Sequence, residues 1–198
     1  MIRAAIFDLD GTLTRTPSPW QHVHHRLGLW QDTASAYLDE WLSGAISYDE
    51  FCHRDTRLWA GRSVQEIEEY LDEIDVNRHV PEIVDRLKDS KIPSIIISSG
   101  FRYLAEKIQT RCDWQPLLIY ANELVEGPEV RIRVSGDATS PLSKRALAVE
   151  ALKHFDATFA ETLVVSDTTR DLEVLADCGF KLLIETEDDL LKVHQYLD

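Results

Sequence analysis

Two aspartates near the amino terminus have the spacing of a paired carboxylate site. Asp8 and Asp10 directly follow a largely apolar run of strand length, residues 2–7, and a Gly-Thr pair comes next. Since side chains alternate along a strand, residues two apart share a face while the chain stays extended. Carboxylates held close together repel each other unless a cation or a shared proton intervenes. The spacing therefore indicates Mg²⁺ at the carboxyl end of a strand, where open α/β sheets bind ligands. A strand followed by a tight Asp-Gly turn would share only the shorter part of this pattern.

Three further groups lie where strands should end and helices begin. Ser99 and Gly100 follow an Ile-rich run, so a hydroxyl and backbone N–H groups there can bind phosphate oxygens. Lys144 starts a helical pattern and could neutralise a carboxylate–phosphate intermediate. Asp167 and Asp171 follow another apolar run with i, i+4 spacing, which places both on one face of a helix. Each group also has a plainer interpretation, as a helix cap or a solvated lysine.

Composition restricts the classes of partner. The net charge of −14 argues against nucleic acid or an anionic membrane, because both would be repelled. A phosphorylated substrate would also be repelled, unless a divalent cation and local Lys or Arg reverse the potential at the site. The three cysteines have no paired spacing for zinc or redox chemistry, and no apolar run reaches the ~18 residues of a membrane span. We expect a cytoplasmic protein, and nothing in the pattern indicates an oligomeric state.

The hydrophobic pattern of the sequence changes near Pro81. Residues 15–81 are helical in pattern and hold four of the five tryptophans, which predicts a separate small bundle with its own aromatic core. Those tryptophans could line a leaving-group pocket, although core packing explains most of them. From residue 82 onward strands and helices alternate, and residues 123–125 and 130–134 suggest a surface hairpin across Gly127-Pro128. We therefore expect an α/β protein with a Rossmann-like, doubly wound parallel sheet and an inserted α-helical cap. Residues 1–14 and 82–198 would form the core, and residues 15–81 the cap.

Taken together and in this order, the four groups resemble the complete motif set of the haloacid dehalogenase-like phosphohydrolases. The phosphoserine-phosphatase-like branch is the most similar, since its cap also follows the first motif. The resemblance implies that Asp8 is the nucleophile and that Asp10 acts first as general acid and then as general base. It also implies Mg²⁺ bound by Asp8, Asp10 and Asp167, with Asp171 in or just behind that shell. Phosphoryl oxygens would be bound by Ser99, Gly100 and Lys144.

Two departures from the family pattern bear on function. The family's last motif usually reads Gly-Asp-Gly, whereas residues 166–171 read Ser-Asp-Thr-Thr-Arg-Asp, and losing both glycines should crowd a turn that favours positive φ. Behind the first motif, residues 16–20 also lack the acidic residue with which the phosphoserine enzymes bind the substrate amine. Phosphoserine is therefore not supported as the substrate.

The prediction is a Mg²⁺-dependent phosphomonoester hydrolase that acts on a small phosphorylated metabolite through an aspartyl-phosphate. The alternative is a phosphatase-like protein with little or no turnover that binds a phospho-ligand or a protein partner. A phospho-accepting receiver module also gathers acidic residues and a lysine on a parallel sheet. It has neither the Asp-Gly-Thr sequence nor a long insertion, so it fits less well.

Overall fold

The carboxyl ends of parallel strands meet at one edge of a central sheet. The computed structural model describes residues 1–115, 117–127, 130–134 and 141–197, except for the side chains of residues 32, 141 and 142. In this part of the chain six strands form one sheet in the order β4-β3-β2-β1-β5-β6, and β4 is antiparallel to β3 whereas the other pairs are parallel. The strands are β1 (Ala4–Phe7), β2 (Ser94–Phe101), β3 (Leu117–Val125), β4 (Arg131–Arg133), β5 (Thr162–Ser166) and β6 (Phe180–Leu183).

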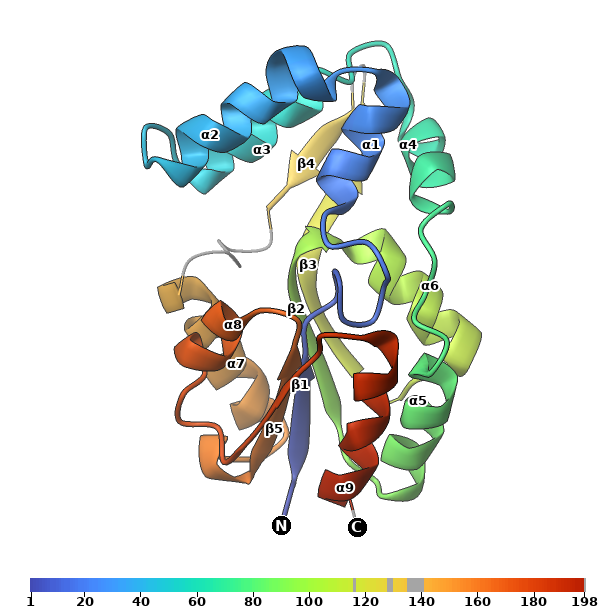
Figure 1. The fold of residues 1–198 in the computed structure, drawn as a ribbon, viewed down its shortest axis with the longest axis vertical. Coiled ribbons are helices and arrows are strands. Elements are labelled where there is room, and N and C mark those ends of the chain that lie inside the picture. Colours follow the sequence, from blue (N-terminus) through green and yellow to red (C-terminus); the bar gives the residue numbers. More distant parts are fainter. Residues whose placement is uncertain (116, 128–129, 135–140, 198) are drawn as a thin grey trace.

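Helices cover both faces of this sheet, as a doubly wound fold requires (Figure 1). One face carries α5 (Val80–Asp89), α6 (Arg102–Cys112), η3 (Glu187–Val193) and α9 (His194–Leu197). The other carries α7 (Pro141–His154) and α8 (Thr169–Val174), and a short turn η2 (Phe159–Glu161) leads into β5. Strand β1 shows why both faces need cover: Ala5 and Phe7 belong to one buried cluster, and Ala4 and Ile6 to the other. The predicted fold class is confirmed.

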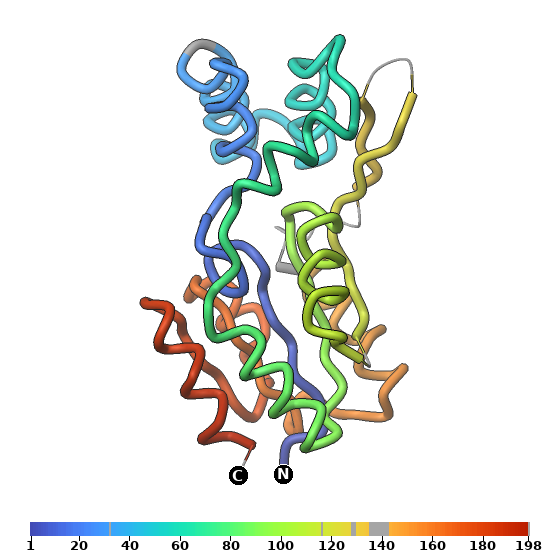
Figure 2. Tube along the Cα trace, turned by 90° about the vertical axis from the view of Figure 1, so that its right-hand side faces the viewer, coloured from blue at the N-terminus to red at the C-terminus, as the bar shows by residue number. Residues whose placement is uncertain are grey.

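A group of helices lies between β1 and α5 in the sequence and beyond the carboxyl ends of the strands in space (Figures 1 and 2). We call residues 19–71 the helical insertion. It consists of α1 (Pro19–Leu27), the π-helical turn η1 (Trp30–Ala34), α2 (Ser35–Leu42), α3 (Tyr48–Arg57) and α4 (Val64–Leu71). Three of these helices, α1, α3 and α4, are capped by serine. The hydroxyl of the residue before each helix accepts a hydrogen bond from a backbone N–H of the first turn, and these residues are Ser18, Ser47 and Ser63. Helix α5 begins at Val80, and the division into a core and a cap at residues 14 and 81 stays a prediction.

The aromatic residues of the insertion do not form a core of their own. Phe101, at the end of β2, lies 4.6 Å from the ring of Trp20 and 6.1 Å from that of Trp59, measured between centroids. All three belong to a buried cluster that continues into the face of the sheet covered by α5 and α6. The expectation of a separate aromatic core was wrong because β2 continues to Phe101, whose ring packs against both indoles.

Strand β3 also differs from its prediction. The sequence pattern predicts one strand over residues 117–121 and a separate hairpin arm over residues 123–125. The structure has one strand that runs without a break from Leu117 to Val125. The antiparallel register of Leu124 with Ile132 confirms the hairpin, and Pro128 of its turn lies outside the described residues. Over the described parts of the chain, no helix combines the length and the apolar character that crossing a bilayer would demand.

Candidate active site

The first and last predicted motifs lie side by side because their strands are neighbours. Strand β1 pairs with β5 in parallel, with Phe7 opposite Val165, and the Asp8 N–H donates to the Val165 carbonyl at 2.9 Å. Just beyond the end of β5, the Asp167 N–H donates to Thr12 Oγ1, also at 2.9 Å. These two hydrogen bonds join the segment after β1 to the segment after β5, so the carboxyls of Asp8 and Asp167 share one site.

Lys144 places a positive charge between two of the predicted carboxyls. The side chain is 6% exposed, and its Nζ lies 3.5 Å from Asp8 Oδ1 and pairs closely with Asp171 Oδ2. Burial by itself lowers the pKa of this lysine, but the carboxylates of Asp8 and Asp171 outweigh it and raise the pKa above its usual value. Ser166 Oγ donates to the same Asp171 oxygen at 3.0 Å. Asp171 is therefore held by Lys144 and Ser166, at the side of Asp8.

The Asp10 carboxyl is held by the last residues of β2, where its pairing with β3 shifts register. Ser98 Oγ donates to Asp10 Oδ2 at 2.8 Å and accepts the Gly100 N–H at 2.8 Å, while Asp10 Oδ1 is buried without a hydrogen-bond partner. A Cβ built on Gly100 would collide with the Asp10 carboxyl, so glycine permits this close approach. Burial raises the pKa of Asp10 to about 7, although the Ser98 hydrogen bond lowers it. A carboxyl that titrates near neutral pH can both give and take a proton.

The site is short of positive charge. Within the part of the chain that the structure describes, four carboxyls, those of Asp8, Asp10, Asp167 and Asp171, lie near one ammonium, that of Lys144. Burial raises the pKa of Asp8 well above its usual value, even though Lys144 opposes the shift, and burial also raises the pKa of Asp167. Asp167 Oδ1, like Asp10 Oδ1, is buried with no hydrogen-bond partner. Oxygen donors left in this state fit a hard divalent cation such as Mg²⁺.

The candidate donors for that cation are carboxyl and backbone carbonyl oxygens. Among the described residues, no three His, Cys, Asp or Glu side chains converge on one point as a ready metal site. Asp171 is turned toward Lys144, which leaves the Asp8 and Asp167 carboxyls and a backbone carbonyl such as that of Asp10 as candidate donors. Mg²⁺ commonly takes only one or two carboxylates and keeps several waters, so this smaller set suits it.

Ser99 and Gly100, predicted to follow a strand in a phosphate-binding turn, lie within β2, which continues to Phe101, and they have a second role there. The Ser99 carbonyl accepts hydrogen bonds from Trp20 Nε1 at 3.0 Å, from Tyr48 Oη at 2.9 Å and from Asn122 Nδ2 at 2.8 Å. Two of these donors belong to the helical insertion and one to β3, so the end of β2 is where the insertion contacts the sheet. The Gly100 N–H donates to Ser98, and phosphate binding by Ser99 and Gly100 stays a prediction.

The turn after β5 is not crowded in the way its sequence suggested. Thr168 has φ −115° and caps α8, and no residue from Ser166 to Asp171 has positive φ. Ser166 Oγ accepts the Thr168 N–H at 3.1 Å, so the two hydroxyl residues stabilise the turn that glycines were expected to permit. Arg170 is exposed beside an open cavity of about 580 Å³ that Asp167 and Arg15 also line. Arg15 is paired with Asp75 and Glu187, so of these two arginines Arg170 is the one with no ion pair among the described residues.

Sequence reasoning missed four positioning side chains: Thr12, Ser98, Asn122 and Ser166. Ser98 and Ser166 each directly precede a singled-out residue at a strand end, and that position was the available signal. Thr12 was read only as part of the Asp-Gly-Thr motif. Asn122 gave no signal, since its contact with the Ser99 carbonyl depends on how β3 lies against β2.

Comparisons with known proteins agree with this geometry. The sequence model of the haloacid dehalogenase-like hydrolases matches residues 5–176. A phosphoserine phosphatase of Archaeoglobus fulgidus is 23% identical over 193 residues, which are 96% of this chain and 55% of that protein. The chain therefore spans about half the length of this curated relative.

Solved structures of phosphoserine phosphatases have the same fold. A substrate-bound complex superimposes with a TM-score of 0.77 at 16% identity and covers all of this chain and 99% of that one. A phospho-aspartyl intermediate analogue of phosphoserine phosphatase gives 0.74 at 16% identity, over 96% and 90% of the two chains. With its sheet, its paired carboxyls and its matching family model, the chain belongs to the haloacid dehalogenase-like hydrolases.

Proposed function

We propose that this protein is a Mg²⁺-dependent phosphomonoester hydrolase that works through an aspartyl-phosphate on Asp8. The observation that carries the proposal is the buried arrangement of Asp8 against Lys144, with Asp10 held nearby by Ser98. A nucleophile beside an ammonium and near a carboxyl that titrates near neutrality is what stepwise phosphoryl transfer needs. The family membership and the phosphoserine phosphatase relatives support the same chemistry.

The reaction divides into two displacements at phosphorus. In the first, an Asp8 oxygen bonds to phosphorus as the ester P–O bond breaks, and Asp10 gives its proton to the departing alcohol oxygen. In the second, a water oxygen bonds to phosphorus, Asp10 takes a proton from that water, and the Asp8–phosphorus bond breaks. Inorganic phosphate leaves, and Asp8 and Asp10 return to their starting states. Lys144 keeps its positive charge beside Asp8 throughout.

Mg²⁺ would be held by the Asp8 and Asp167 carboxyls and the Asp10 carbonyl, with Asp171 beside them. When bound, it supplies positive charge that stabilises the transferring phosphoryl group. Ser99, the Gly100 amide and Lys144 would bind the phosphoryl oxygens. In this proposal residues 15–81 act as a cap that selects the leaving group, and residues 1–14 and 82–198 form the core that performs the chemistry.

The deciding experiment is phosphate release from a panel of small phosphomonoesters, with Mg²⁺ and with chelator. Asp8→Asn removes the nucleophile and should lower release by at least about 10³-fold. Asp156→Asn makes the same chemical change at a side chain that is 99% exposed, so it should keep full activity. No release from any ester by the folded wild type would overturn the proposal and favour a phospho-ligand-binding protein with little turnover.

A further inference from the structure

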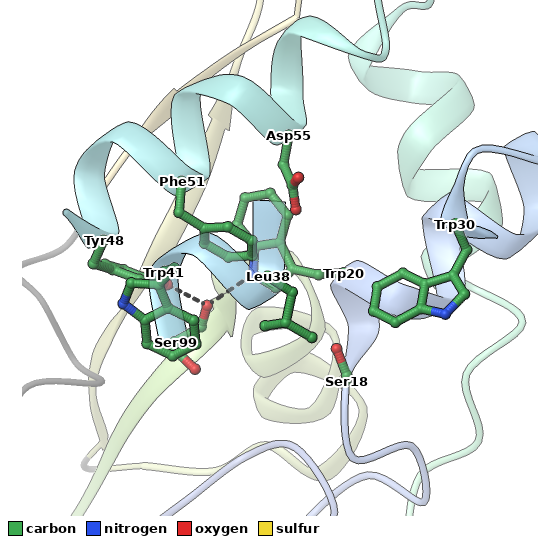
Figure 3. A pocket seen from close by; sticks show the side chains of 9 residues that line it. All are labelled: Ser18, Trp20, Trp30, Leu38, Trp41, Tyr48, Phe51, Asp55 and Ser99. Atoms are coloured by element: carbon green, nitrogen blue, oxygen red, sulfur yellow. Dashed lines mark hydrogen bonds between the residues drawn. The ribbon is translucent and has the colours of Figure 1, made fainter. Parts of the chain in front are cut away.

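A small aromatic cavity lies between the helical insertion and the end of β2. Its volume is about 100 Å³, and five aromatic side chains line it: Trp20, Trp30, Trp41, Tyr48 and Phe51 (Figure 3). The Trp41 and Phe51 rings stack with centroids 5.3 Å apart, and Trp20 lies 6.0 Å from Phe51. The π-helical turn η1 begins at Trp30, an irregularity that is frequent at functional sites. The proposed phosphoryl chemistry uses none of these rings.

A buried carboxylate closes one end of this cavity. Asp55 is 1% exposed, lines the cavity, and has no hydrogen-bond partner for its Oδ1 (Figure 3). Its Oδ2 lies 3.1 Å from His24 Nε2. A buried polar atom without a hydrogen-bond partner destabilises the folded state, because it has lost its hydrogen bonds to water and gained none in the protein.

The histidine contacts only one oxygen of this carboxylate. Trp59 Nε1 donates to His24 Nδ1 at 3.4 Å, so the Nε2 edge of the ring faces Asp55 Oδ2. Asp55 Oδ1 keeps no hydrogen-bond partner, and of the described residues that line the cavity none is Lys or Arg. A cationic ligand would supply the partner that this oxygen lacks.

We propose that this cavity binds the ammonium group of the substrate's leaving alcohol, with Asp55 as the counter-charge and the tryptophans as the surrounding cage. Indole faces attract cations through their quadrupole, most strongly when water is excluded, and the carboxylate adds a direct charge partner. The cavity has room for a group about three waters in size, which suits a primary or methylated ammonium but not a sugar or a nucleoside.

One lining residue places the cavity beside the end of β2 that contacts Asp10. Ser99 lines the cavity and lies beside Gly100, which packs against the Asp10 carboxyl. A phosphate monoester of a short amino alcohol would therefore place its phosphate at Asp8 and its ammonium among the aromatic rings. A carboxylate on the same substrate, as in phosphoserine, would have no cationic partner among the described lining residues. This inference rests on the proposed function, which names the phosphate end of the same ligand.

Binding of the free alcohol tests the cavity without any turnover. Isothermal titration calorimetry would compare choline with 3,3-dimethylbutanol, in which carbon replaces the charged nitrogen at nearly the same size. The wild type should bind choline at least about tenfold more tightly, and Asp55→Asn should reduce that ratio to within about twofold. Asp49→Asn, on the same helix but 71% exposed at its side chain, should keep the wild-type ratio.

A second variant keeps the test valid if Asp55→Asn fails to fold. Trp41→Leu leaves the Asp55–His24 pair in place and should weaken choline binding while hardly changing the affinity for 3,3-dimethylbutanol. Equal or tighter binding of the uncharged alcohol by the wild type would overturn the proposal. So would a loss of the same factor for both alcohols in Asp55→Asn.

Hydrolysis separates this inference from the proposed function. Phosphocholine should be a better substrate than 3,3-dimethylbutyl phosphate, by at least about tenfold in kcat/KM. Selective choline binding without hydrolysis of either ester would uphold the cavity and overturn the proposed turnover. Equal hydrolysis of both esters without selective binding would uphold the phosphatase and overturn the ammonium site.

Discussion

Asp10 shows at the scale of single residues how the fold adapts an ordinary carboxyl to proton transfer. Its side chain is 8% exposed, one of its oxygens accepts from Ser98, and the other has no hydrogen-bond partner. Desolvation favours the neutral acid, and the Ser98 hydroxyl favours the carboxylate. The balance leaves a group that can hold a proton at neutral pH and release it when an alkoxide forms.

Asp10→Asn tests this role through the leaving group. Asparagine keeps the acceptor for Ser98 but cannot transfer a proton, so hydrolysis of an alkyl phosphate should fall by about 10²–10⁴-fold. Nitrophenolate leaves without protonation, so phosphorylation of the protein by p-nitrophenyl phosphate should fall much less. Stopped-flow absorbance would measure the nitrophenolate burst, with Asp8→Asn as the burst-free control. An equal loss for both esters would contradict the acid role.

Most of the site could be predicted from the sequence at this scale. Asp8, Asp10 and Asp167 were predictable because each follows an apolar run that can only be a buried strand. The pairing of Asp171 with Lys144 was not, because it depends on how α7 and α8 pack against each other. Ser98 was also hard to single out, since a serine before a Ser-Gly turn is ordinary until its neighbour across the sheet is known.

At the scale of elements, the end of β2 must come close to the loop after β1. Gly100→Ala should fold but lower phosphate release by at least about 10²-fold, because its Cβ would displace the Asp10 carboxyl. Gly61→Ala is the matched control: φ is +82° and nothing lies near its Cβ position, so it should lose about 1–2 kcal/mol of stability and no activity. Release assays and urea denaturation would measure both effects.

Helices α1 and α3 are joined through His24 and Asp55, and this contact should make stability depend on pH. Burial raises the folded-state pKa of Asp55, while the hydrogen bond to His24 opposes the shift. Folding therefore favours the protonated acid. That contribution is complete below the unfolded-state pKa of about 3.9 and is lost as pH rises through the higher folded value.

Asp55→Asn removes this titration. Without ligand, the free energy of unfolding of the wild type minus that of Asp55→Asn should therefore fall as pH rises from about 4 through the raised pKa. Urea denaturation of both proteins across this range gives the difference directly. A difference that is flat or that grows with pH would contradict the burial of an uncompensated carboxylate.

At the scale of the whole molecule, binding of Mg²⁺ should be visible in thermal stability. A ligand that binds only the folded state stabilises it by about 2.7 kcal/mol at 100 times its Kd, which shifts Tm by about 5–10 °C in a chain of this size. Asp167→Asn should remove most of the shift. Because the chain carries a net charge of −14, NaCl at matched ionic strength must serve as the reference. An equal shift with NaCl would overturn specific binding.

The overall architecture could be read from the sequence more fully than the contacts between its parts. Alternating apolar runs and helical periods in residues 82–198 predicted the doubly wound sheet, and the helical pattern of residues 15–81 predicted the helices of the insertion. Two features were inaccessible because local pattern carries no information about them. Phe101 joins the aromatic residues of the insertion to the main core, and three donors converge on the Ser99 carbonyl.

The hydrogen bond from Trp20 to the Ser99 carbonyl makes the Trp20 indole a fluorescent reporter of this contact. Indole emission responds to the surroundings of its ring, and Trp20 is buried where the insertion contacts the end of β2, with its N–H donating to the Ser99 carbonyl. Any motion that separates the insertion from β2 must break this bond and hydrate the ring. Trp20 emission would report such a motion in the native chain, with no dye attached.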